Sequence, residues 1–148
     1  MNPIRLSLAI CLTTIFNTAW PQDVKNNLEE AFIKVESKVI EWRHDLHQNP
    51  ELSNREFKTA AKVAALLRSL NFDEVQTGVA HTGVVGTLVG KNPGPVVALR
   101  ADMDGLPVLE QTGSPFASKA RGEYNGQDVP VMHACGHDTH VAMLMGAA

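Results

Sequence analysis

The sequence has few cysteines, few aromatic residues and no block of like charge. Two of its 148 residues are cysteine, and 5% are aromatic. So few thiols exclude a small domain that is held together by several disulfides. The net charge is −3 and is not concentrated in any segment, so we do not expect a nucleic-acid-binding surface. The remaining composition, 44% hydrophobic and 20% charged, is ordinary for a globular domain with a packed core.

The sequence also lacks an apolar run long enough to cross a bilayer. Its N-terminal apolar stretch, residues 6–16, follows the lone charge of Arg5 and precedes the small and polar residues 17–19. This order is typical of a secretory signal peptide, so we interpret residues 1–19 as a signal segment that is cleaved after Ala19. The alternative is a buried N-terminal helix. We expect an exported protein, periplasmic or secreted, with no membrane association after cleavage.

Cleavage would leave one thiol in the mature chain. It would remove Cys11, so that Cys135 could form no internal disulfide. A lone thiol outside the cytoplasm is exposed to oxidation, and coordination to a metal ion would protect it.

Hydrophobic spacing predicts two helices at the start of the mature chain. Residues 23–47 carry apolar side chains at every third or fourth position, which predicts an amphipathic helix that ends before Pro50. Ser53 and Glu56 have the spacing of a capping box, so we expect a second helix to begin after Ser53.

Strands are expected to follow. Residues 73–77 predict a short strand, and two β-branched runs, 82–90 and 94–101, are separated by a turn signal. We expect these two runs to form an antiparallel pair, with Val96 to Leu99 central in the sheet. Residues 108–130 are predicted as a polar loop, and a closing helix is expected to begin near Asp138. The fold class is therefore α/β.

Two carboxylates follow the expected central strand in "ADMDG". Asp102 and Asp104 are two residues apart, so on an extended chain both side chains point the same way. Like charges this close repel unless a cation, a histidine or a shared proton relieves them. The segment is therefore a candidate site at a strand's carboxyl end, and the alternative is ordinary turn chemistry.

The "HACGH" segment combines thiol and imidazole groups. Cys135 and His137 are two residues apart in a glycine-containing stretch, so both can converge on one point. Thiolate and imidazole suit zinc, and imidazole also suits nickel. Asp138 or a strand-edge aspartate could bridge or orient an imidazole, and His140 can share a helix face with His137. A nucleophilic Cys–His pair and a purely structural role remain alternatives.

Polar groups also gather near the end of the first helix. Arg43 and His47 are four residues apart on one helix face, and Glu51 follows Pro50. These groups could simply lie at a solvated helix end, or they could help to shape the site, and the sequence leaves both interpretations open.

Three stretches together resemble a known family. They are "RHDLHQNPEL" (43–52), "RADMDGLP" (100–107) and "MHACGHDTH" (132–140). In order and spacing they are similar to the amidohydrolase branch of the aminoacylase and carboxypeptidase-G-type metallopeptidases. That branch includes auxin-conjugate hydrolases, hippurate hydrolases and N-acyl-amino-acid deacylases. The resemblance covers roughly residues 38–148.

The resemblance implies a three-layer α/β catalytic domain with two divalent metal ions, which could be zinc, manganese or nickel. It implies that Cys135 and His137 are metal ligands and that Asp104 lies beside the metals and orients a ligand. Asp102 falls where related branches carry a metal-binding histidine, so its role as a ligand does not carry over. The implied reaction is hydrolysis of the amide bond of N-acyl or N-aroyl amino acids.

The family's general base, remaining ligands and inserted lid domain are expected beyond Ala148. We therefore expect residues 20–148 to be the truncated N-terminal part of the catalytic domain and to be inactive alone. A homodimer through the lid domain is a further expectation from the resemblance. The alternatives are a non-catalytic metal-binding relative and a thiol enzyme that uses Cys135.

Overall fold

The structure, a computed structural model, describes residues 21–148, so the expected signal segment lies outside the described residues. Along this part of the chain the elements are α1 (Gln22–Gln48), α2 (Phe57–Ser69), β1 (Glu74–Val79), β2 (Gly83–Thr87), β3 (Arg121–Tyr124), β4 (Gln127–Pro130) and α3 (His137–Ala147). Among the described helices, none combines the length and the apolar character needed to span a bilayer.

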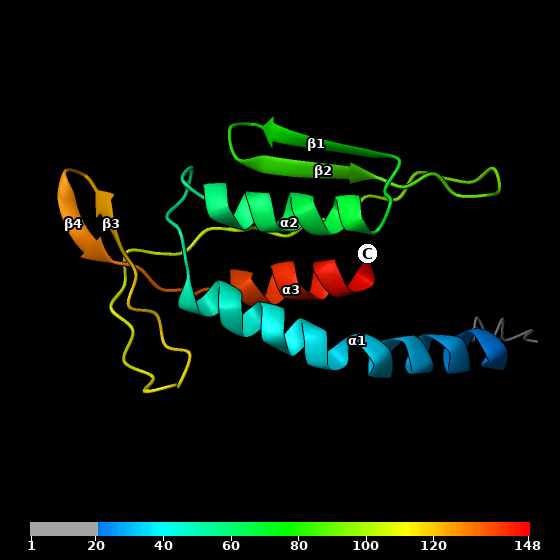
Figure 1. The fold of residues 1–148 in the computed structure, drawn as a ribbon, viewed down its shortest axis with the longest axis horizontal. Helices are drawn as coiled ribbons and strands as arrows, with labels where there is room; N and C mark the ends of the chain where they lie inside the picture. Colours follow the sequence, from blue (N-terminus) through cyan, green and yellow to red (C-terminus); the bar gives the residue numbers. More distant parts are fainter. Residues whose placement is uncertain (1–20) are drawn as a thin grey trace, which may run out of the picture.

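The core lies where α3 packs along the second half of α1 (Figure 1). Leu46 of α1 meets Val141, Ala142 and Met145 of α3, and all four side chains are buried. The first half of α1 extends past α3, and its apolar residues Val24, Leu28 and Phe32 are exposed. The predicted helix is therefore confirmed over its full length, but only its second half contributes to this core.

Helix α2 lies between α3 and the β1–β2 hairpin in Figure 1. The expected capping box is wrong, because the helix begins at Phe57 and Glu56 makes no capping hydrogen bond. The Glu56 carboxylate instead accepts hydrogen bonds from the Thr82 hydroxyl at 2.7 Å and from the Asn54 amide at 3.0 Å. Glu51 caps the helix in its place, since its carboxylate accepts the amides of Lys58 at 3.1 Å and Thr59 at 2.8 Å.

The expected pairing of residues 82–90 with 94–101 is also wrong. Strand β2 pairs instead with β1, the strand predicted at residues 73–77, in an antiparallel hairpin. The chain then leads away from this hairpin, and residues 96–100 run as an extended segment that pairs with no described strand. Val96 is 98% exposed and Val97 77%. An extended segment without a hydrogen-bonded neighbour has no ladder to join, whatever its β propensity.

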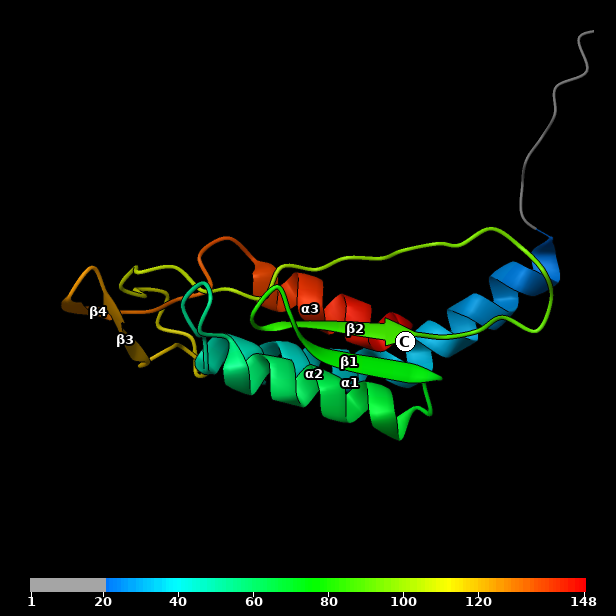
Figure 2. The same cartoon turned by 90° about the horizontal axis from the view of Figure 1, so that it is seen from above.

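A second hairpin, β3–β4, replaces part of the predicted loop at residues 108–130. Its turn is formed by Asn125 and Gly126, both with positive φ, as a two-residue hairpin turn requires. The hairpin stands at the end of the molecule opposite the first half of α1 in two perpendicular views (Figures 1 and 2). In the sequence, the Asn-Gly pair is the feature that indicates this hairpin.

Candidate metal centre

His137 and Asp104 are in direct contact at the start of α3. An isolated bridge between Leu106 and Met132 brings the segment after Asp104 beside the segment before His137, and a second bridge, between Leu52 and Gly105, joins the Asp104 segment to the residues that follow α1. His137 Nδ1 lies 3.0 Å from Asp104 Oδ1 and 3.1 Å from the Asp104 carbonyl oxygen. Because both partners are acceptors, this contact requires the proton on Nδ1, and the neutral ring then has its lone pair on Nε2. Nε2 is therefore the atom through which this imidazole can bind a metal ion.

Asp102 faces the other side of the same ring. Its Oδ2 lies 3.9 Å from His137 Nε2, while its Oδ1 pairs with Arg100. The two carboxylates that the sequence placed on one side of an extended chain therefore converge on one imidazole. His140 also shares the face of His137, with ring centroids 5.7 Å apart.

The segment that precedes His137 contains one exposed and one buried candidate donor. Cys135 is an exposed free thiol, and His133 is 5% exposed. Burial lowers the pKa of His133, and the nearby positive charge of His47 adds to this effect, while the Asp138 carboxylate opposes it. Both ring nitrogens of His133, like Oδ1 of Asp138, lack a hydrogen-bond partner among the described residues.

Asp138 does not orient an imidazole of the metal segment. It is 1% exposed, and its Oδ2 forms an ion pair with Arg43 Nε at 3.0 Å and lies 2.8 Å from His47 Nδ1. The question left open for Arg43 and His47 is thereby answered structurally: both are bound to a buried carboxylate at the end of α1.

Glu110 completes this group, and sequence reasoning missed its role. Its Oε1 lies 3.1 Å from His47 Nε2, and its Oε2 accepts the Ser118 amide. Burial raises the pKa of Glu110, but the hydrogen bonds from Thr112, Ser118 and His47 outweigh it, so the pKa lies below its usual 4.5. Phe116 of the same loop stacks on His44 with centroids 3.9 Å apart.

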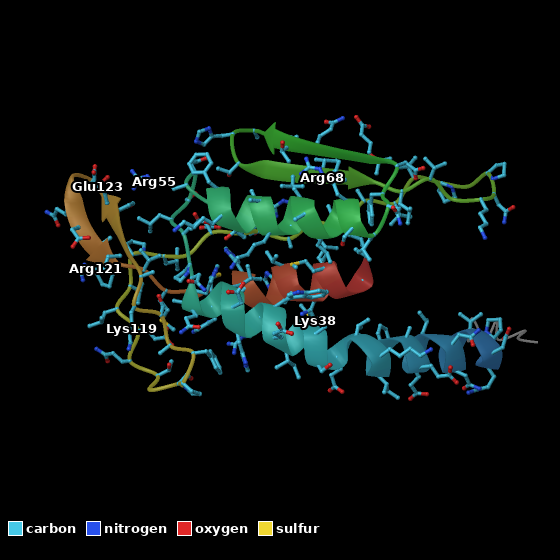
Figure 3. All side chains as sticks on the ribbon, in the orientation of Figure 1. Lys38, Arg55, Arg68, Lys119, Arg121 and Glu123 are labelled. Carbon is cyan, nitrogen blue, oxygen red and sulfur yellow. The ribbon has the colours of Figure 1, made fainter. Side chains whose placement is uncertain are left out.

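A hollow of about 320 Å³ lies beside Asp104. Arg55 and Asp104 are the charged residues of its lining, which also includes Tyr124 and Asn125 of the β3–β4 turn. Figure 3 shows Arg55 at the same end of the molecule as Arg121 and Glu123 of β3.

Comparison with known proteins shows which family this chain is similar to. Residues 98–148, which contain both site segments, match Peptidase family M20/M25/M40. The chain is 48% identical to thermostable carboxypeptidase 2 of Saccharolobus solfataricus over 128 residues, which are 86% of this chain and 29% of that protein. It is 45% identical to an N-acyl-L-amino acid amidohydrolase of Geobacillus stearothermophilus over 124 residues, 84% of this chain and 31% of that protein.

Solved structures agree with the sequence matches. The Bacillus subtilis YXEP protein, a dinuclear metal-binding peptidase from the M20 family, aligns with a TM-score of 0.64 at 41% identity, covering 74% of this chain and 28% of that chain. A structure from methicillin resistant Staphylococcus aureus aligns with a TM-score of 0.71 at 41% identity, covering 82% of this chain and 30% of that chain.

The chain is therefore similar to peptidase family M20/M25/M40, through the family match at residues 98–148 and the likeness to a solved M20 peptidase over 74% of its length. Its α/β fold class is thereby confirmed, because the alignments are to catalytic domains of this family. The chain spans about three tenths of the length of the curated relatives named above.

His137 is the described residue whose surroundings best suit a metal ion. Within residues 21–148, no group of three or more His, Cys, Asp or Glu side chains is placed so as to hold a metal ion. The donor chemistry nevertheless fits, because His137 presents a free Nε2 and hydrogen-bonds a carboxylate through Nδ1. Metal-bound histidines in proteins characteristically have this arrangement.

Proposed function

We propose that the whole protein is a metal-dependent amidohydrolase that cleaves the amide bond of N-acyl or N-aroyl amino acids. The names of its relatives support amide hydrolysis, and the match to a dinuclear metal-binding peptidase supports two divalent cations. The single observation that carries the proposal is the His137–Asp104 contact, which leaves Nε2 free beside Asp102 and two residues from Cys135.

In this proposal Cys135 and His137 hold metal, and Asp104 keeps the His137 ring oriented. Zinc suits a thiolate–imidazole pair and imidazole also suits nickel, whereas manganese favours oxygen ligands such as carboxylates. When bound, two such cations polarise the scissile carbonyl and lower the pKa of a water molecule. Cys135 must lose its proton to act as a ligand, and its exposed position leaves the thiol accessible to an incoming ion.

The hollow beside Asp104 suits the substrate class. An N-acyl amino acid carries one free carboxylate, and Arg55 supplies a cation to the lining of that hollow. No ion pair of Arg55 is found among the described residues, so its guanidinium is available to an anion.

A thiol mechanism is less well supported. It needs an imidazole hydrogen-bonded to the Cys135 sulfur. In the described part of the chain His137 Nδ1 is engaged by Asp104, and no imidazole is hydrogen-bonded to the thiol.

The test uses the whole protein, loaded with zinc, manganese or nickel and assayed on hippurate and N-acetyl amino acids. Cys135→Ala is expected to lose bound metal and hydrolysis together, because a ligand is removed. His81→Ala, an imidazole on the distant turn between β1 and β2, is the matched control and should retain both. Full hydrolysis by Cys135→Ala at unchanged metal stoichiometry would overturn the ligand assignment.

We also propose that the protein is exported and that residues 1–19 are its signal peptide. The support is the charge of Arg5, the apolar residues 6–16 and the small residues before Trp20. N-terminal sequencing of the mature protein is expected to begin near Trp20, and a mature protein that retains Met1 would contradict export.

A further inference from the structure

Two side chains of helix α1 bind Asp138, the residue that follows His137. The buried Oδ2 of Asp138 forms an ion pair with Arg43 Nε at 3.0 Å and lies 2.8 Å from His47 Nδ1. These two residues lie one helical turn apart on α1, and α1 is fixed against α3 by the core around Leu46. In Figure 1 the start of α3 lies against the end of α1 that carries both residues. The first turn of α3 therefore cannot move relative to α1 without breaking these contacts.

The same network reaches the other end of the metal segment. His47 Nε2 contacts Glu110 Oε1 at 3.1 Å, and Glu110 Oε2 accepts the Ser118 amide. The Ser118 hydroxyl then donates to the carbonyl of Val131 at 2.7 Å. Residues 131 and 138 are thus both tied to His47, and Cys135 and His137 lie between them.

The network is buried. The side chains of His47, Asp138 and Glu110 are 6%, 1% and 0% exposed. Each nitrogen of the His47 ring lies within hydrogen-bond distance of a carboxylate oxygen, Nδ1 at 2.8 Å from Asp138 and Nε2 at 3.1 Å from Glu110. Removal of one partner would leave a buried charge without compensation, which proteins tolerate poorly.

We propose that His47 and Arg43 are positioning residues of the metal centre, which fix residues 131–138 at both ends and thereby set the separation of Cys135 from His137. The inference rests on the proposed function only in taking these two residues as metal ligands. His47 and Arg43 act in this proposal through Asp138 and Glu110 and not as ligands, so loss of either should weaken metal binding without removing a ligand.

The experiment measures cobalt(II) binding to the whole protein by chelator competition and by the absorption spectrum of the bound ion, with no substrate present. His47→Ala is expected to bind cobalt about 10- to 100-fold more weakly and to change the absorption spectrum of the bound ion. Substitutions of residues that support metal ligands typically have an effect of this size. His44→Ala is the matched control, because it removes an imidazole from the same helix. The His44 ring stacks on Phe116 and is not among the partners of Asp138. This variant should stay within about twofold of the wild type.

A second pair of variants covers the case in which His47→Ala does not fold. Arg43 is 33% exposed, so Arg43→Ala should fold, and it is expected to weaken cobalt binding, whereas Arg43→Lys should restore most of it. Wild-type affinity and spectrum in the folded His47→Ala and Arg43→Ala variants would overturn the inference. So would a wild-type protein that binds no cobalt. Normal cobalt binding without hydrolysis of any N-acyl amino acid would instead reject only the proposed substrate.

Discussion

Asp104 and Asp102 both face the ring of His137, but they lie beside different nitrogens of it. Asp104 accepts the Nδ1 proton, whereas Asp102 lies 3.9 Å from Nε2 and is already paired with Arg100. Asp104→Asn in the whole protein should therefore lower turnover about 100-fold while much of the metal stays bound, because a positioning group is lost and a ligand is not. Asp102→Asn should cost less. The check is kcat beside metal content for both variants, and the reverse ranking would mean that Asp102 holds the more important position.

At this scale the sequence predicted the groups that are close in the chain. The spacing of Asp102 and Asp104 on an extended segment was enough to place both carboxylates on one side. The partners of Asp138 were not predictable in this way, because His47 is 91 positions away and the contact depends on how α1 and α3 pack. Glu110 was missed because its contact with His47 also joins distant positions, and because its polar loop gives no periodic signal.

Helix α2 shows how a cap can come from outside the expected motif. Glu51 accepts the amides of Lys58 and Thr59, while Ser53, which the sequence placed as the cap, is exposed. Glu51→Gln is expected to lower the free energy of unfolding of the whole protein by about 1 kcal/mol, since a charged acceptor at a helix N-terminus is neutralised. Ser53→Ala is the matched control and should change stability by less than about 0.5 kcal/mol. Urea unfolding measures both, and a larger loss in Ser53→Ala would restore the capping box.

The elements themselves were predicted to different degrees. All three helices were predicted, because apolar spacing survives in any packing arrangement. The partners of the strands were not predicted. Propensity indicates that residues 96–99 favour an extended conformation, but it does not indicate which segment lies beside them. The β3–β4 hairpin was predictable from Asn125-Gly126 and was overlooked within a polar stretch.

Across the whole molecule, the described residues leave a long apolar segment uncovered. Val96, Val97 and Leu99 are mostly exposed, on a segment that also has unpaired backbone groups. Residues 21–148 expressed alone should therefore self-associate through this segment, and should not hydrolyse hippurate in the presence of zinc, manganese or nickel. Light scattering and the hydrolysis assay test both statements. Val97→Lys should reduce the association, and hydrolysis at the rate of the whole protein would show that these residues contain every catalytic group.

Glu51 links two distant parts of this molecule. Its carboxylate holds the amides of Lys58 and Thr59, and its carbonyl oxygen accepts the amide of Gly105 at 2.6 Å, next to Asp104. Local opening around Glu51 would expose all three amides to solvent at once. In deuterated water, the amide hydrogens of Lys58, Thr59 and Gly105 should therefore exchange as one cooperative unit, although nearly fifty residues separate the two regions.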